Sequence, residues 1–258
     1  ADEIAGDVAH VFTIIPAGAE PHEYEPSAQD IARMYESDML IVNGAGIEPW
    51  LEDVSKNIDT ERTAIIVAGE PLATERMIEE GEEVADPHVW LDPVLVQEMV
   101  SRIADGFVSR DPDRGALYLA NAEALRAKLA SLDVDYRREL SMCEQHTIVT
   151  SHAAFGYLAL RYGFDQIAVT GVSPEAEPSS QELGEIVDFV KENGIKYIFF
   201  ETLVSPKLAQ VLAKEAGADT LVLNPLEGLT ANELTSGKNY LTEMRANLKN
   251  LKIALECI

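Results

Sequence analysis

The sequence contains only two cysteines, Cys143 and Cys257, and they do not form the C-x-x-C motif of zinc and redox sites. Either a disulfide that holds the C-terminus or two buried thiols would fit their positions. Basic residues are also few: 20 Lys and Arg accompany 45 Asp and Glu, so the formal net charge is −25. This balance argues against nucleic acid and anionic membranes as direct partners and favours attraction of cations.

Long apolar runs and common catalytic motifs are absent as well. No apolar stretch approaches the roughly 20 residues of a membrane helix. No basic and apolar leader precedes the first residues, which is consistent with a mature or trimmed chain. The chain has no H-E-x-x-H motif, and no Ser or Cys has the setting of a nucleophile. These absences favour a binding protein over an enzyme.

Three of the five histidines lie in similar turns. His88 lies in DPHVWLDP (residues 86–93), where two prolines restrict the backbone. His22 lies in a proline-rich loop, and His152 follows a predicted strand. Neutral imidazole is a good zinc ligand, and three histidines plus one carboxylate form a tetrahedral set. We therefore predict that the three bind one metal ion, against the alternative of three unrelated surface histidines.

Strands and helices alternate in both halves of the chain, which predicts an α/β fold. Short apolar runs predict strands, and amphipathic segments between them predict helices. A further strand is expected over Val8–Ile15, which is rich in β-branched residues, and a solvated loop over the acidic residues 71–85. The other predicted strands are 39–42, 63–68, 147–150, 166–170, 197–200 and 220–223. The predicted helices begin near residues 27, 48, 93, 153, 182, 206 and 239.

One predicted helix is unusually long. Asp111 and Pro112 form a strong helix start, and neither Gly nor Pro interrupts residues 116–142. A helix of about 30 residues would be ~45 Å long, more than one small domain needs. We therefore expect two lobes, each with a parallel β-sheet flanked by helices, joined by this rigid helix.

The expected organisation is an N-terminal lobe over residues 1–110, a linking helix over 111–142 and a C-terminal lobe over 143–258. The first lobe contains His22 and His88, and the second contains His152. The metal is therefore expected in the cleft between the lobes. Ligands in parallel sheets lie beyond the carboxyl ends of strands, where His152, Glu201 and Asn224 fall.

Four motifs closely resemble the zinc and manganese substrate-binding proteins of ABC transporters, the cluster A-I proteins or metal-binding adhesins. The motifs are PHEYEP (21–26), the segment 43–51 with its Asn-Gly and Glu-Pro-Trp-Leu, DPHVWLDP (86–93) and SPEAEP (173–178). The resemblance implies two α/β lobes bridged by one long helix, and a membrane permease with its ATPase as partners. It also implies an extracytoplasmic location, periplasmic or lipid-anchored, and a strand ahead of the first residue given.

The resemblance also implies a ligand set. His22 and His88 match the first two ligands, and His152 matches the third, where manganese-type members have glutamate and zinc-type members histidine. Nitrogen at three positions favours zinc. Many members have an aspartate where this chain has Asn224, and an amide is a poor ligand. We therefore assign the fourth position to Glu227, with Glu201 as a backup that could instead orient a histidine.

The prediction is thus extracytoplasmic, high-affinity capture of Zn2+ as bound substrate and its delivery to an ABC permease, by a monomer without enzymatic activity. A manganese-binding counterpart is the alternative within the family. A zinc hydrolase with three histidine ligands, and Glu227 or Glu201 as general base, is the alternative outside it, and a host-matrix adhesin is another. The long helix predicts only modest closure when metal binds.

Overall fold

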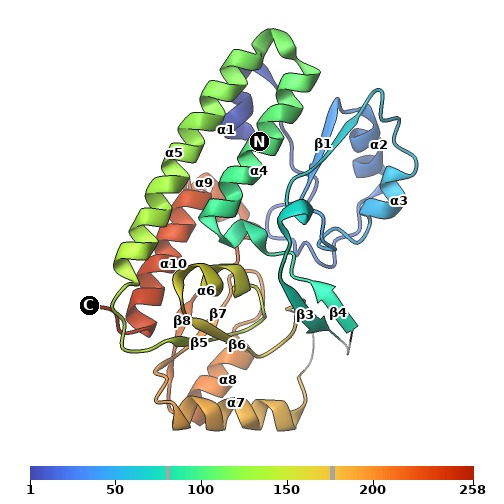
Figure 1. Ribbon diagram of the computed structural model, residues 1–258. Helices are drawn as coiled ribbons and strands as arrows, with labels where there is room; N and C mark the ends of the chain where they lie inside the picture. Colours follow the sequence, from blue (N-terminus) through green and yellow to red (C-terminus); the bar gives the residue numbers. More distant parts are fainter. Residues whose placement is uncertain (80–81, 175–177) are drawn as a thin grey trace.

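The computed structural model describes residues 1–79, 82–174 and 178–258. One parallel sheet lies in the first half of the chain and another in the second, and the long helix α5 (Gly115–Glu139) runs past both (Figure 1). The predicted α/β fold with two lobes and one joining helix is therefore confirmed. Residues 80 and 81 of the acidic segment and residues 175–177 of the SPEAEP motif lie outside the described residues.

The sheet of the first lobe pairs β1 (Met39–Val42) with β2 (Ala64–Val67) in parallel, with Met39 opposite Ala64. Helices α2 (Ala28–Glu36) and α3 (Leu51–Ser55) lie beside it. The predicted helix start near residue 27 is confirmed, because Ser27 caps α2: its side chain accepts a hydrogen bond from the Asp30 backbone N–H. The core between these elements consists of Met34, Leu40, Val42, Val54 and Ile58.

The predicted strand over Val8–Ile15 is wrong. The helix α1 (Asp2–Ala5) and the 3-10 turn η1 (Gly6–Val8) lead into a segment that joins no sheet of the described part of the chain. A cavity of about 880 Å³ lies between this segment and β1. β-Branched composition favours an extended backbone, but a strand also needs a neighbour within hydrogen-bonding distance. The strand implied ahead of the first residue stays a prediction.

The predicted loop over residues 71–85 is also wrong. The segment contains a 3-10 turn η2 (Glu70–Leu72) and an antiparallel pair, β3 (Arg76–Glu79) with β4 (Glu82–Ala85). Met77 lies opposite Val84, and such cross-strand pairs stabilise a short ribbon despite its acidic composition. The Glu75 backbone N–H donates a 3.0 Å hydrogen bond to the Tyr157 hydroxyl of the other lobe, which fixes the start of the ribbon.

Helix α5 contributes to the cores of both lobes. It has 25 residues, about 37 Å at 1.5 Å per residue, and its predicted first turn is a separate 3-10 turn, η4 (Pro112–Arg114). Tyr118 and Ala122 in its first half pack with α1 and with α4 (Pro93–Arg110). Leu132 and Tyr136 in its second half belong to the core of the second lobe. The helix therefore packs against both lobes and is not an exposed linker.

The second lobe has a four-stranded parallel sheet in the order β6-β5-β7-β8. Ile148 and Phe199 face the core formed with α5, α6 and α10, whereas Val149 and Ile198 face the core formed with α7 and α8. The helix α6 begins at Gly156, three residues after the predicted start. The bounds are β5 Thr147–Thr150, α6 Gly156–Tyr162, β6 Asp165–Ala168, α7 Ser180–Glu192, β7 Tyr197–Phe200, α8 Lys207–Ala216, β8 Asp219–Val222, α9 Ala231–Thr235 and α10 Tyr240–Ala254.

Cys143 and Cys257 form a disulfide, which resolves the two alternatives left open by the sequence. It joins the segment after α5 to the residues after α10. In the part of the chain that the structure describes, no helix is both long and apolar enough to cross a bilayer. The lobe boundaries at residues 110 and 142 stay a prediction.

Candidate metal centre

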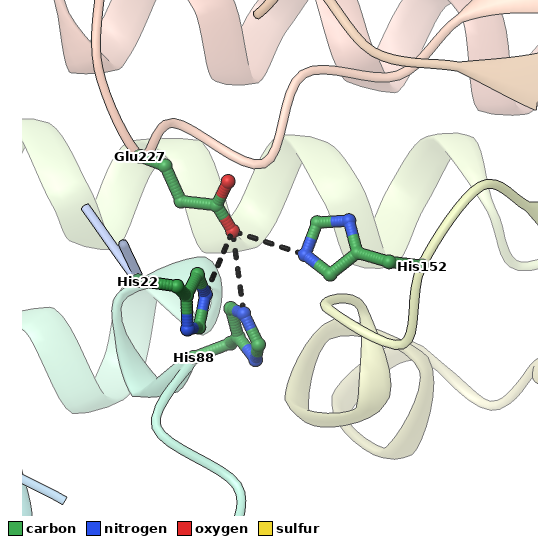
Figure 2. A group of neighbouring side chains, drawn as sticks. All are labelled: His22, His88, His152 and Glu227. Carbon is green, nitrogen blue, oxygen red and sulfur yellow. Dashed lines mark hydrogen bonds and ion pairs between the residues drawn. The ribbon is translucent and has the colours of Figure 1, made fainter. Parts of the chain in front are cut away.

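The structure brings together the four residues that the sequence singles out. His22 lies in the loop before α2, His88 lies at the start of the 3-10 turn η3 (Val89–Leu91), His152 follows β5, and Glu227 follows β8. One potential ligand atom from each lies within 4.8 Å of the others. Figure 2 shows one oxygen of Glu227 facing all three imidazole rings. Residues from both lobes therefore meet at one point.

The distances in this cluster fit one small cation. Glu227 Oε1 lies 3.0 Å from His152 Nε2, 3.3 Å from His88 Nε2 and 3.7 Å from His22 Nε2. Tetrahedral zinc ligands at about 2.0–2.1 Å from the ion lie about 3.3 Å from one another. Nε2 of His22 and Nε2 of His88 are buried and form no hydrogen bond among the described residues. Buried, unpaired imidazole nitrogens are suitable metal ligands.

A carboxylate orients His88. Asp86 Oδ1 accepts the His88 backbone N–H at 2.9 Å and lies 2.7 Å from Nδ1 of the ring. With Nδ1 held this way, Nε2 faces Glu227 and can offer its lone pair to a metal. The His88 side chain is fully buried, so the ring orientation is fixed by packing as well.

A carboxylate orients His152 in the same way, from the second lobe. Glu201 Oε1 accepts the His152 backbone N–H at 3.2 Å and lies 2.7 Å from its Nδ1. Glu201 follows β7, the neighbour of β5, so the two residues meet at the carboxyl end of adjacent strands. The structure places Glu201, the backup ligand, on the ring nitrogen that does not contact Glu227. This position corresponds to the orienting role considered from the sequence.

A hydrogen-bonded turn presents Glu227. Asn224 accepts the Leu226 backbone N–H at 2.8 Å through its side-chain oxygen. The Asn224 backbone is hydrogen-bonded in both directions by the Asn247 side chain, at 2.7 and 2.8 Å. Asn224 therefore shapes the turn and does not belong to the ligand cluster.

The charges of the cluster stabilise one another. Burial alone would raise the pKa of Glu227, but the hydrogen bond with His152 and the nearby imidazoles of His22 and His88 lower it well below its usual 4.5. Burial alone would lower the pKa of His152, yet its hydrogen bonds to Glu201 and Glu227 raise it to about 10. Burial alone would likewise lower the pKa of His88, but its contact with Asp86 and the nearby Glu227 raise it. A metal that binds here therefore has to displace protons from His152 and His88.

The contacts of two acidic residues with the histidine segments were not predicted from the sequence. Glu20 Oε1 accepts the His22 backbone N–H at 2.9 Å, just as Asp86 accepts that of His88. Both acids precede a proline and a histidine, and this repeated acid-Pro-His pattern is the signal that could have found them. Burial raises the pKa of Glu20, and the nearby Glu227 raises it further.

Comparison with known proteins shows the family of the chain. Residues 1–254 match the family described as ZnuA, zinc-uptake complex component A periplasmic. The chain is 43% identical over 261 residues to the zinc-binding lipoprotein AdcA of Streptococcus pneumoniae strain R6, covering 97% of this chain and 52% of AdcA. It is 38% identical to the high-affinity zinc uptake system protein ZnuA of Bacillus subtilis, covering 98% of this chain and 83% of that protein.

A solved structure shows the same fold. The Zn(II)-bound ZnuA-like domain of Streptococcus pneumoniae AdcA superposes with a TM-score of 0.84 at 42% identity, covering 99% of this chain and 94% of that domain. The chain spans about half the length of the AdcA proteins that it matches. The matched residues 1–254 extend over both lobes, and the four residues of the cluster lie within this range. The chain therefore belongs to the family of ZnuA, the periplasmic component A of zinc-uptake complexes.

Proposed function

We propose that this chain captures Zn2+ outside the cytoplasm, through His22, His88, His152 and Glu227, and delivers it to an ABC permease. The observation that carries the proposal is the convergence of three imidazole nitrogens on one carboxylate oxygen, at 3.0 to 3.7 Å, from both lobes. Such a set matches the tetrahedral geometry of zinc. Membership of a zinc-uptake family points to the same ion.

The donor atoms favour zinc over manganese. Three nitrogens and one carboxylate suit zinc, whereas manganese prefers a larger share of oxygen ligands. Zinc also exceeds manganese in affinity at almost any site of nitrogen and oxygen. A manganese-binding counterpart is therefore the second candidate, and it concerns only which ion is transported. Growth on each metal would decide between the two ions.

The closed ligand set supports binding and not catalysis. Catalytic zinc sites keep one position open for water, whereas four protein ligands fill the tetrahedron here. Glu227 is within the cluster, and Glu201 is hydrogen-bonded to His152, so both candidate general bases already have other roles. We therefore infer that the chain is not a zinc hydrolase.

Partners and location follow from the same proposal. We infer that a membrane permease and its ATPase receive the metal, and that the protein works as a monomer, periplasmic or lipid-anchored at the outer face of the membrane. The net charge of −25 fits cation capture and disfavours nucleic acid as a partner.

A competition titration tests the proposal. A chelating zinc indicator is titrated against the wild-type protein and against His152→Ala, with His10→Ala and His146→Ala as controls. These two controls change the remaining exposed histidines. We expect tight binding of one zinc ion by wild type and both controls, and loss of binding in His152→Ala. Equal binding by His152→Ala and wild type would refute the proposed site.

A further inference from the structure

One hydrogen bond ties the two halves of the metal cluster together. The indole N–H of Trp90 donates to the carbonyl oxygen of Pro225 at 2.7 Å. Trp90 lies two residues after His88, and Pro225 lies two residues before Glu227. The bond therefore joins the segment that presents His88 of the first lobe to the turn that presents Glu227 of the second.

Trp90 is itself held in place from several sides. Its ring lies 5.2 Å from the His88 ring, centroid to centroid. Its carbonyl oxygen accepts a 2.8 Å hydrogen bond from the Tyr240 hydroxyl at the start of α10. Two residues on, Asp92 forms a 2.6 Å ion pair with Arg161 of α6. The indole N–H is thus a fixed donor, so it can constrain the turn that it contacts.

The turn needs such a constraint. Leu226 has a φ of +60°, a left-handed conformation that is unfavourable for leucine. Strained residues of this kind persist where the surrounding structure holds them. The Asn224 side chain holds the Leu226 N–H, and the Trp90 indole holds the preceding carbonyl. Together they direct the next residue, Glu227, toward the imidazoles.

We propose that Trp90 is a positioning residue for Glu227, coupling the presentation of this ligand to the His88 segment of the other lobe. This inference rests on the proposed metal site. Without the indole N–H, the Pro225 carbonyl loses its partner, the turn relaxes, and Glu227 is no longer held against the three nitrogens. The effect falls on metal dissociation, because the bond maintains the assembled cluster.

Trp90→Phe tests this inference, since phenylalanine keeps an aromatic ring but has no N–H. We expect zinc to dissociate about tenfold faster, the change typical of losing one hydrogen bond. Dissociation is measured by stopped flow with excess chelator. Trp50→Phe is the matched control: Trp50 is the only other tryptophan, and its indole nitrogen has no hydrogen-bond partner among the described residues. Wild-type dissociation from Trp90→Phe would overturn the inference.

A double-mutant cycle separates positioning from general destabilisation. If Trp90 acts through Glu227, Trp90→Phe should add no further loss of zinc affinity in a Glu227→Gln background. Full additivity of the two losses would overturn the inference. Absence of zinc binding by the wild-type protein would instead refute the proposed function, so the two failures are distinguishable.

If Trp90→Phe does not fold, a measurement that leaves Trp90 unchanged tests the inference. In Trp50→Phe, the indole N–H of Trp90 gives the single tryptophan side-chain signal in a nitrogen-correlated NMR spectrum. A hydrogen-bonded indole should exchange its proton slowly with solvent. Exchange at the rate of a free indole would overturn the inference.

Discussion

His88 Nε2, in the first lobe, lies 3.3 Å from Glu227 Oε1, in the second lobe. The two residues are presented by segments that interlobe contacts already hold together, including Glu75 with Tyr157 and Asp92 with Arg161. Helix α5 contributes residues to the cores of both lobes. The lobes are therefore joined at the site and along the helix, which favours modest closure on metal binding over a wide hinge motion.

Zinc should stabilise the protein, and His152→Ala should remove most of this effect. A ligand at 100 times its dissociation constant adds about 2.7 kcal/mol to the free energy of unfolding. We expect a corresponding rise in the melting temperature of wild type on addition of zinc, measured by calorimetry. His146→Ala, which changes an exposed histidine six residues away, should retain the rise. An equal rise in His152→Ala would contradict the assignment of this ligand.

Zinc binding should release protons. The pKa of His152 is raised to about 10, through bonds to Glu201 and Glu227 that outweigh burial, and the pKa of His88 is raised as well. Zinc requires the neutral imidazole, so the apparent affinity should increase with pH through the neutral range. Calorimetric titration in two buffers of different ionisation enthalpy measures the number of protons released. A heat of binding independent of the buffer would contradict this prediction.

The stability of the protein prepared without metal should change in the opposite direction with pH. The raised pKa of His152 stabilises the fold below the ordinary value of 6.5, and this contribution is lost as the pH rises toward about 10. The lowered pKa of Glu227 stabilises the fold above 4.5, and this contribution is lost as the pH falls below that value. Denaturant unfolding should therefore give the highest stability between about pH 4.5 and 6.5. A stability that rises steadily from pH 6.5 to 10 would be inconsistent with these shifts.

The carboxylates that contact Nδ1 of His88 and His152 should affect metal affinity almost as much as the ligands do. Glu201→Gln and Asp86→Asn keep the shape of each side chain but remove its charge from the Nδ1 of His152 or His88. Loss of such an orienting partner typically lowers metal affinity about 10- to 100-fold. The indicator titration measures it, with Glu82→Gln in the exposed ribbon as the control. Unchanged affinity in both variants would show that ring orientation does not depend on these carboxylates.

The disulfide should affect stability and not the metal site. Cys143 and Cys257 close a loop with a sequence separation of 114, and removal of a native disulfide commonly costs 2–5 kcal/mol of stability. The double variant Cys143→Ser, Cys257→Ser should unfold at lower denaturant concentration but keep the zinc affinity of wild type. A large loss of zinc affinity in the folded variant would show coupling that the structure does not explain.

Local pattern predicted the parts of the fold that depend on local chemistry. The capping box at Ser27, the uninterrupted apolar spacing of α5 and the buried run Tyr197–Phe200 each specify their own element, and the structure has all three. The prediction of a strand over Val8–Ile15 failed because a strand needs a hydrogen-bonded neighbouring strand, which can be distant in the sequence. The β3–β4 ribbon was hidden because three of its eight paired residues, Glu79, Glu82 and Glu83, are acidic, a composition typical of a solvated loop.

The candidate site, like the fold, was predictable from the sequence only in part. His22, His88 and His152 could be singled out because histidine is rare and each lies in a constrained turn. The contacts of Glu201, Asp86 and Trp90 depend on which segments the tertiary fold brings together, and no local pattern specifies that. Only the acid-Pro-His repeat at Glu20 and Asp86 carried a local signal for an orienting group.

The most direct test of the account is a crystal structure of the protein grown with zinc. We predict one ion bound by Nε2 of His22, His88 and His152 and by a carboxylate oxygen of Glu227, each at about 2.0–2.1 Å. Zinc bound elsewhere, or imidazole rings that point away from a common centre, would contradict the proposed capture site.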